Sequence, residues 1–276
     1  MKYYKIFLLV SSYLFFACSL SHQQVKTVRI QGSDTMLLLT ELLAEEYMKK
    51  NPSVSIYVYG GGTSSGVRSL INGEVDICTA SRNLTAEEVN LIAEHYGNVG
   101  LAIQIAKDGL CIFINPGNPI KDFTIEELKK IFTCQIKNWK ELGGTDNKIS
   151  LIIRNPNSGT HAYLKNYVLE ETDYCTDAEV FSTMQDVINA VSENKYAIGY
   201  GGFTLKKEIS NAKINGIDAT ESNIINNKYP ITRYLFFYTI DNPKGILKEF
   251  IDWVLSDEGQ KLVKKSGYLP LWEIQY

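Results

Sequence analysis

The sequence predicts an α/β fold with largely parallel sheets, arranged in two blocks. Short apolar runs alternate along the chain with segments of helical periodicity, which is the pattern of strands connected by helices. The length of 276 residues allows one large domain or two medium ones. Hydrophobic residues make up 45% of the chain and charged residues 21%, as in ordinary globular proteins.

The first block follows the N-terminal segment. Apolar runs predict strands at 28–31, 54–59 and 75–79, and helical periodicity predicts helices at 36–49 and 65–72. Thr85 is followed three residues later by Glu88, a capping-box pattern that predicts the start of another helix.

The second block begins with a strand at 109–115, which a Pro-Gly-Asn-Pro turn at 116–119 ends. Thr124 and Glu127 form a second capping box. Further strands are predicted at 150–153, 197–200 and 232–240, and further helices at 158–169, 186–193 and across 244–265. The aromatic run 234–238 lies inside the long apolar strand, which favours a core or hinge position over a stacking platform. Periodicity does not assign the C-terminal piece to either block.

The first eighteen residues have the layout of an export signal. Lys2 and Lys5 precede an apolar run at 6–16 that is too short to span a bilayer as a mature helix. Ala17 and Cys18 follow, and Cys18 resembles a bacterial lipoprotein cleavage site at which the new N-terminal cysteine carries lipid. The alternative, a buried apolar hairpin, is disfavoured by the polar stretch 19–26. We therefore expect an exported protein, periplasmic or at the cell surface, with a lipid anchor at Cys18.

Charge and cysteine content exclude some classes of function. The formal net charge is -3, and Lys and Arg are dispersed, so nucleic acid is not an expected partner. The four cysteines after Cys18 form no CxxC pair and have no neighbouring His, so neither a metal nor a cofactor is expected. Cys78 and Cys111 lie in apolar runs and are interpreted as small core residues. A bond between Cys134 and Cys175 is left open, because spacing alone does not decide it.

Three polar loops each open a predicted helix, at 32–35, 60–66 and 154–160. Helix N-termini offer unpaired N–H groups and partial positive charge, so each is a potential anion site. Glycines permit close approach of the backbone, Ser and Thr hydroxyls add donors, and Arg154 supplies a planar fork. For each loop alone, helix capping is the better explanation. The second loop lacks the Gly-Lys-Ser/Thr of a Walker motif. Three such loops in one chain favour an anion held jointly by several helix ends.

Several segments resemble the phosphate-binding components of bacterial ABC transporters. They are GSDT at 32–35, GGGTSSGVRSLINGEVDICTASR at 60–82, RNPNSGT at 154–160, AIGYG at 197–201, and typical stretches at 132–144 and 250–271. The likeness covers nearly the whole mature chain in order. The Arg-x-x-x-Ser-Gly-Thr element is its most specific part.

This resemblance implies a two-lobed fold of the type II periplasmic-binding-protein kind, with the ligand in a cleft between lobes joined by two hinge strands. By this analogy, residues 25–106 plus 230–276 form lobe 1 and residues 107–229 form lobe 2. The implied function is capture of inorganic phosphate outside the cytoplasm, as a monomer, and delivery to the permease subunits of an ABC transporter. The implied phosphate ligands are Thr35, Met36, Thr63, Ser81, Arg82, Arg154, Ser158, Gly159 and Thr160.

One position departs from well-known phosphate binders, which place an Asp where this chain has Arg82. That carboxylate accepts a proton from the ligand and so favours protonated phosphate over fully ionised sulfate, since a mismatched polar group in a dry site costs on the order of 2–7 kcal/mol. Asp34 is a candidate replacement for this proton acceptor. Its alternative role is that of a helix cap beside Ser33.

Three rival functions remain. The missing Asp leaves sulfate, molybdate or tungstate as alternative cargo, and the same fold could serve a surface sensor or adhesin. An enzyme with Ser158 or Thr160 as nucleophile and His161 as base is disfavoured, because no acidic residue near His161 in the sequence would orient it. We therefore expect a binding protein and not an enzyme.

Overall fold

A computed structural model describes residues 25–272 of the chain. The strands of these residues are β1 Lys26–Gly32, β2 Val54–Tyr59, β3 Ile77–Ala80, β4 Leu101–Ile114, β5 Asp122–Phe123, β6 Ser150–Arg154, β7 Glu179–Phe181, β8 Ala197–Gly202, β9 Ser210–Asn211, β10 Lys213–Ile214 and β11 Thr232–Thr239. The helices are α2 Leu37–Lys50, α3 Thr63–Ile71, α4 Ala86–Tyr96, α5 Ile125–Phe132, the 3-10 helix η1 Trp139–Leu142, α6 Gly159–Tyr167, α7 Met184–Glu193, α8 Glu221–Ile225, α9 Gly245–Val254 and α10 Asp257–Lys265. The expected export signal and Cys18 lie outside the described residues.

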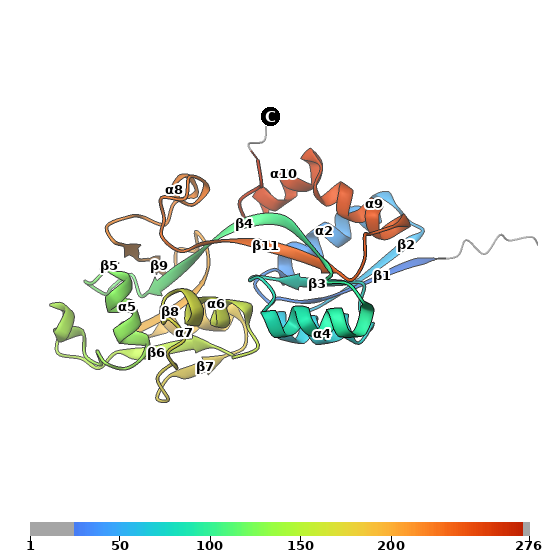
Figure 1. Cartoon of the computed structure of the whole chain (residues 1–276). Coiled ribbons are helices and arrows are strands. Elements are labelled where there is room, and N and C mark those ends of the chain that lie inside the picture. The colour runs from blue at the N-terminus through green and yellow to red at the C-terminus, as the bar shows by residue number, and fades with distance from the viewer. Residues whose placement is uncertain (1–24, 273–276) are drawn as a thin grey trace, which may run out of the picture.

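One long sheet runs through the molecule in the order β2-β1-β3-β11-β4-β8-β6-β7, with β9 beside β4. The first residues of β4 pair with β11, and its last residues pair with β8. Strand β4 therefore belongs to both halves of the sheet, and it runs beside β11 across the middle of the molecule (Figure 1).

The hydrophobic core is divided in the same way. One cluster combines residues between 110 and 231 with Leu269. A second cluster packs α2, α9 and α10 against β1, β2 and the first part of β4. A third, smaller cluster packs α3 against β3 and β11. Helices α9 and α10 lie on one side of the sheet and α4 on the other (Figure 1).

The α/β prediction is confirmed, and both capping boxes are present, at Thr85 with Glu88 and at Thr124 with Glu127. The sheet, however, is mixed and not largely parallel, because β11 is antiparallel to β3 and β4, and β4 is antiparallel to β8. The chain leaves the first half through β4 and returns through β11, so these strands must run in opposite directions.

Strand β4 is also longer than predicted. The sequence indicated a strand at 109–115, whereas β4 begins at Leu101. Its first four residues alternate between partial and full exposure, and from Ile105 onward every residue is buried. Lys107 and Asp108 lie within this buried stretch. In the sequence, two adjacent charged residues suggest a break in the strand, so the strand was predicted to begin after them.

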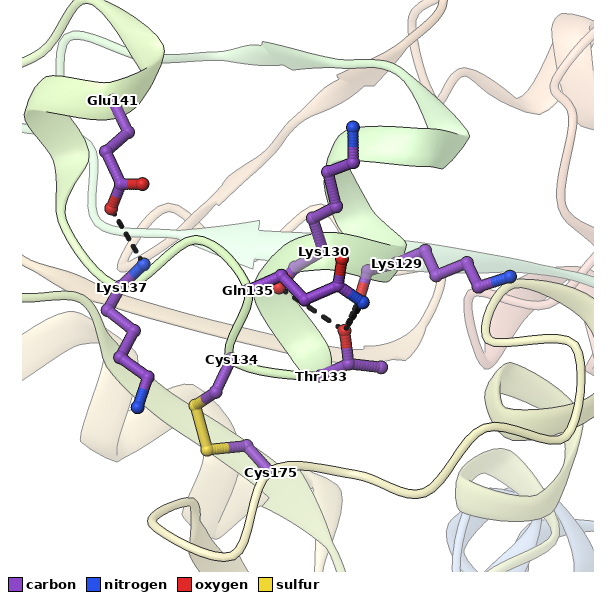
Figure 2. The surroundings of a disulfide bond; sticks show 8 residues. All are labelled: Lys129, Lys130, Thr133, Cys134, Gln135, Lys137, Glu141 and Cys175. Atoms are coloured by element: carbon purple, nitrogen blue, oxygen red, sulfur yellow. Dashed lines mark hydrogen bonds between the residues drawn. A yellow bond between two sulfur atoms is a disulfide. The ribbon is translucent and has the colours of Figure 1, made fainter.

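Cys134 and Cys175 form a disulfide with Cα atoms 5.3 Å apart, which answers the question left open by their spacing. The bond joins the end of α5 to the segment before β7 (Figure 2). A cavity of about 240 Å³ adjoins it, lined in part by Ile136, Lys148 and Asp177. Cys78 and Cys111 are buried and unbonded, as predicted for core residues. No helix within 25–272 is both long and apolar enough to cross a membrane.

Candidate anion-binding site

The start of helix α6 lies against the ends of two other elements. Ser158 caps the helix, because its hydroxyl accepts from the Thr160 N–H at 3.2 Å. A Cβ at Gly159 would lie 2.3 Å from Thr63 Oγ1 and 2.5 Å from Ser81 Oγ. Only glycine therefore allows α6 to approach α3 and the end of β3 so closely.

Two further contacts join these loops. The hydroxyls of Thr35 and Thr160 lie 2.9 Å apart and are both buried. The Ser64 N–H donates to the Asn157 carbonyl at 3.3 Å. The three polar loops singled out in the sequence are therefore brought to one place, although they are far apart along the chain.

Arg154 is the largest charged side chain in this place, and it is fully buried. Its Nη2 donates to the Ser182 carbonyl at 2.7 Å and lies 3.5 Å from Asp34 Oδ2. Burial lowers the pKa of Arg154 and the Asp34 carboxylate opposes this effect, but an arginine remains protonated in proteins. A single carboxylate at 3.5 Å is a weak counter-charge for a fully buried guanidinium.

Several donors at this place have no partner in the described part of the chain. They are Nε and Nη1 of Arg154, Nε of Arg82 and the hydroxyl of Ser81, all of them buried. An unsatisfied buried polar group costs about 1–3 kcal/mol, and more when it is charged. Because these donors share one site with the start of a helix, the arrangement is suited to an anion with several oxygens.

Thr63 and Met36 are engaged by their own surroundings. The Thr63 hydroxyl accepts from the Ser81 N–H at 3.3 Å, which places both residues at the contact with Gly159. The Met36 N–H donates to the Ser33 carbonyl at 2.9 Å, and the Met36 side chain is buried in the core. The role of Met36 as a ligand contact stays a prediction.

Asp34 takes a position beside Arg154. Its Oδ1 accepts from the Gly61 N–H at 2.8 Å, so the carboxylate ties the first polar loop to the second. Helix α2 has no side-chain cap among residues 25–272, so Asp34 does not have the capping role considered as its alternative. Its second oxygen, Oδ2, lies 3.5 Å from Arg154 Nη2.

Arg82 lies near the site but is paired with a carboxylate. Its Nη1 and Nη2 donate to Glu88 at 2.7 and 2.8 Å, and Nη2 also donates to Ser64 Oγ at 3.1 Å. Burial disfavours the charged form of Glu88, but the hydrogen bonds and charge of Arg82 together with the hydrogen bonds from Thr85 outweigh this effect, so the pKa of Glu88 is lowered. Glu88 thus neutralises Arg82 locally, and Arg154 remains the strongest source of positive charge.

His161 does not form a catalytic pair in the described structure. Its Nδ1 lies 2.7 Å from the Arg154 carbonyl oxygen, which can only accept, so Nδ1 carries the proton. The Ser158 hydroxyl is occupied by capping α6. Burial lowers the pKa of His161, so the ring is held neutral as a support for the Arg154 backbone.

Sequence reasoning missed the pair Asp108 and Arg233. Arg233 Nη2 lies 2.8 Å from Asp108 Oδ2, and both side chains are fully buried. Arg233 Nη1 also donates to the Ser81 carbonyl at 3.2 Å. The available signal was Asp108 within an apolar run, since a carboxylate buried in a strand requires a cationic partner.

This chain is similar to several known proteins. A sequence model of the PBP superfamily domain matches residues 19–258. The phosphate-binding protein PstS of Bacillus subtilis is 33% identical over 257 residues, covering 90% of this chain and 82% of that protein. PstS of Borreliella burgdorferi is 30% identical over 279 residues, covering 96% and 97%.

A solved structure agrees with these sequence relatives. It is a Clostridium perfringens protein with bound phosphate, described as a phosphate ABC transporter substrate-binding protein. It superposes with a TM-score of 0.82 at 32% identity, covering 90% of this chain and 100% of that one. The two-lobed fold class expected from the resemblance is therefore confirmed. The chain belongs to the PBP superfamily and, within it, to the family of PstS phosphate-binding proteins.

Proposed function

We propose that this protein captures inorganic phosphate outside the cytoplasm and delivers it to the permease of an ABC transporter. The observation that carries the proposal is Arg154, a fully buried guanidinium with two nitrogens that have no partner within residues 25–272. The Ser81 hydroxyl, also without a partner there, lies where the start of α6 meets the end of β3. Burying a charge in this way is unfavourable unless a bound anion pairs with the guanidinium and accepts its remaining hydrogen bonds. The names of the relatives support phosphate as that anion.

The proposed ligand contacts come from both sides of the site. Thr35, Thr63 and Ser81 approach from the ends of β1, α3 and β3, while Arg154 and the start of α6 approach from the other side. We assign the first group to a lobe of residues 25–106 plus 230–276 and the second to a lobe of residues 107–229. Strands β4 and β11 are the hinge of this proposal. Neither lobe alone surrounds a tetrahedral anion, so affinity depends on closure.

Asp34 is the proposed acceptor of the ligand proton. Protonated phosphate offers an O–H to its second carboxylate oxygen, whereas fully ionised sulfate offers only lone pairs. A carboxylate facing a sulfate oxygen would be repulsive in a dry site. Phosphate is therefore favoured even though Arg82 stands where an acidic residue is typical.

The proposal includes an exported, monomeric and lipid-anchored protein. The export-signal pattern at 1–18 and the cysteine at its end support export and the anchor, and the relatives are named phosphate-binding proteins. Fractionation of cells that express the wild type and Cys18→Ser tests the anchor. We expect the wild-type protein in the membrane fraction and the Cys18→Ser variant in the soluble fraction. Both proteins in the soluble fraction would contradict anchoring.

Calorimetric titration tests the ligand. The mature protein, stripped of bound phosphate, is titrated with phosphate, sulfate and molybdate at two pH values. Tight one-to-one binding of phosphate alone is expected. Preference for sulfate or molybdate would change the proposed ligand but not the proposed closure of two lobes around an anion. No binding of any of the three anions would refute oxyanion capture and favour the sensor or adhesin alternative.

A further inference from the structure

The two strands through which the chain crosses between the halves of the sheet, β4 and β11, are joined by a buried ion pair. Asp108 of β4 and Arg233 of β11 lie directly opposite each other in the antiparallel ladder. Their side chains are 0% and 1% exposed, respectively. This is the point at which β4 changes its partner from β11 to β8, so the pair sits where the chain crosses between the proposed lobes.

Removing two charges from water is costly, and such a pair persists only if its geometry is good and its other hydrogen bonds are satisfied. Arg233 Nε and Nη2 donate to Asp108 Oδ2 at 2.9 and 2.8 Å. The Phe203 N–H donates to Asp108 Oδ1 at 3.0 Å. The remaining Arg233 nitrogen, Nη1, donates to the Ser81 carbonyl at 3.2 Å. Of these outer bonds, the one from Arg233 therefore goes to Ser81, a residue of the proposed site.

Ser81 is the first part of the proposed site that Arg233 contacts. Its backbone is held from both ends, by Thr63 at the N–H and by Arg233 at the carbonyl. The side chain between them carries the buried hydroxyl that has no partner within residues 25–272. These two bonds fix the backbone of Ser81, and therefore the point from which its side chain extends into the site.

Helix α6 is the second part. Tyr163, on the turn after Gly159 and Thr160, donates its hydroxyl to the Thr232 carbonyl at 2.6 Å. Its ring also lies 5.6 Å from the Arg233 guanidinium carbon, a cation–π contact. Arg233 thus contacts both the helix whose start carries donors of one lobe and the residue that carries the hydroxyl of the other.

We propose that Arg233, held by Asp108, is a positioning residue for anion capture, which sets the Ser81 hydroxyl and the start of α6 for closure without touching the ligand. This inference rests on the proposed function. It predicts that Arg233 acts through Ser81, so that the effects of changing the two residues on phosphate affinity are not additive.

The test is a double-mutant cycle of Arg233→Lys and Ser81→Ala, with the phosphate dissociation constant measured by calorimetry for all four proteins. Lysine keeps a charge opposite Asp108 but cannot also reach the Ser81 carbonyl in the same planar fork. Each single variant is expected to bind phosphate about tenfold more weakly, which corresponds to one charge-assisted hydrogen bond. The double variant is expected to lose only about tenfold to twentyfold, well below the product of the two single effects.

Arg29→Lys is the matched control. Arg29 pairs with Asp76 through Nε and Nη2, and Nη2 also reaches the Gly73 carbonyl, but this pair is partly exposed and makes none of the contacts described for the site. Its phosphate affinity is expected to stay within about twofold of the wild type. Thermal unfolding of every variant without phosphate shows whether it is folded.

The outcomes separate this inference from the function beneath it. Wild-type protein that binds no oxyanion would refute the proposed function. Wild-type protein that binds phosphate, together with an Arg233→Lys variant of unchanged affinity or with additive losses in the cycle, would overturn the positioning role and leave the function intact. An equal loss in the Arg29→Lys control would also overturn it, because any arginine pair would then have the same effect.

Discussion

Replacement of Arg154 by methionine is the most direct test of how the site holds an anion. Methionine has similar length and no charge, so the variant removes the guanidinium without leaving a large cavity. Within residues 25–272, Arg154 makes one firm hydrogen bond, to the Ser182 carbonyl, and one 3.5 Å contact with Asp34. The free energy of unfolding without phosphate is therefore expected to be little changed, or to rise, because an incompletely paired buried charge is removed.

The effect on binding is expected to be large. Two nitrogens of Arg154 are buried and unpartnered, and a hydrogen bond to a charged group contributes about 1.5–3 kcal/mol. Two such bonds would give about 3–6 kcal/mol, and measured losses for one partner of a buried charged contact are about 2–5 kcal/mol. We therefore expect Arg154→Met to lose about 2–5 kcal/mol of phosphate binding, which is about 30-fold to several thousandfold in the dissociation constant.

Two measurements together check this reasoning. Calorimetry gives the dissociation constant, and thermal unfolding with and without phosphate gives the stabilisation by ligand, which should be almost absent in the variant at phosphate concentrations that saturate the wild type. Arg82→Met is the matched comparison, because Glu88 already neutralises Arg82, and a smaller loss of affinity is expected. A loss of less than about 0.5 kcal/mol for Arg154→Met, or a larger loss for Arg82→Met, would refute the assignment of Arg154 as the principal cation.

Three other changes test separate parts of the site and fold. Asp34→Asn keeps an oxygen for the Gly61 N–H but can donate to sulfate, so the preference for phosphate over sulfate should fall at least about tenfold in competition titrations; an unchanged ratio would exclude Asp34 as proton acceptor. Gly159→Ala places a Cβ 2.3 Å from Thr63 Oγ1 and should weaken phosphate binding by about 1–3 kcal/mol through overpacking; wild-type affinity would mean that this contact is not needed for closure. Cys134→Ser with Cys175→Ser opens a link across 41 residues and should lower the free energy of unfolding by about 2–4 kcal/mol in denaturant titrations with phosphate affinity unchanged, since neither cysteine lies in the site; a large loss of affinity would contradict that separation.

Local chemistry in the sequence determined much of this protein. The capping boxes at Thr85 and Thr124 start helices where predicted, because their hydrogen bonds span only three residues. The loop that runs from Arg154 to Thr160 was predicted to connect a strand to a helix, and it connects β6 to α6. Glycine and hydroxyl residues at helix starts were sufficient to predict an anion site from the sequence alone.

Only the tertiary structure decided which side chains meet. Asp34 lies beside Arg154, and Arg233 beside Asp108, across more than one hundred residues of chain. Arg82 has the same formal charge as Arg154, yet Glu88 neutralises it, so its residue type alone does not reveal its role. Sequence patterns report the period of an element and the face that it buries. The partner of a buried charge depends instead on which strands become neighbours, and β4 and β11 bring Asp108 and Arg233 together only after the chain has formed the second half of the sheet and returned.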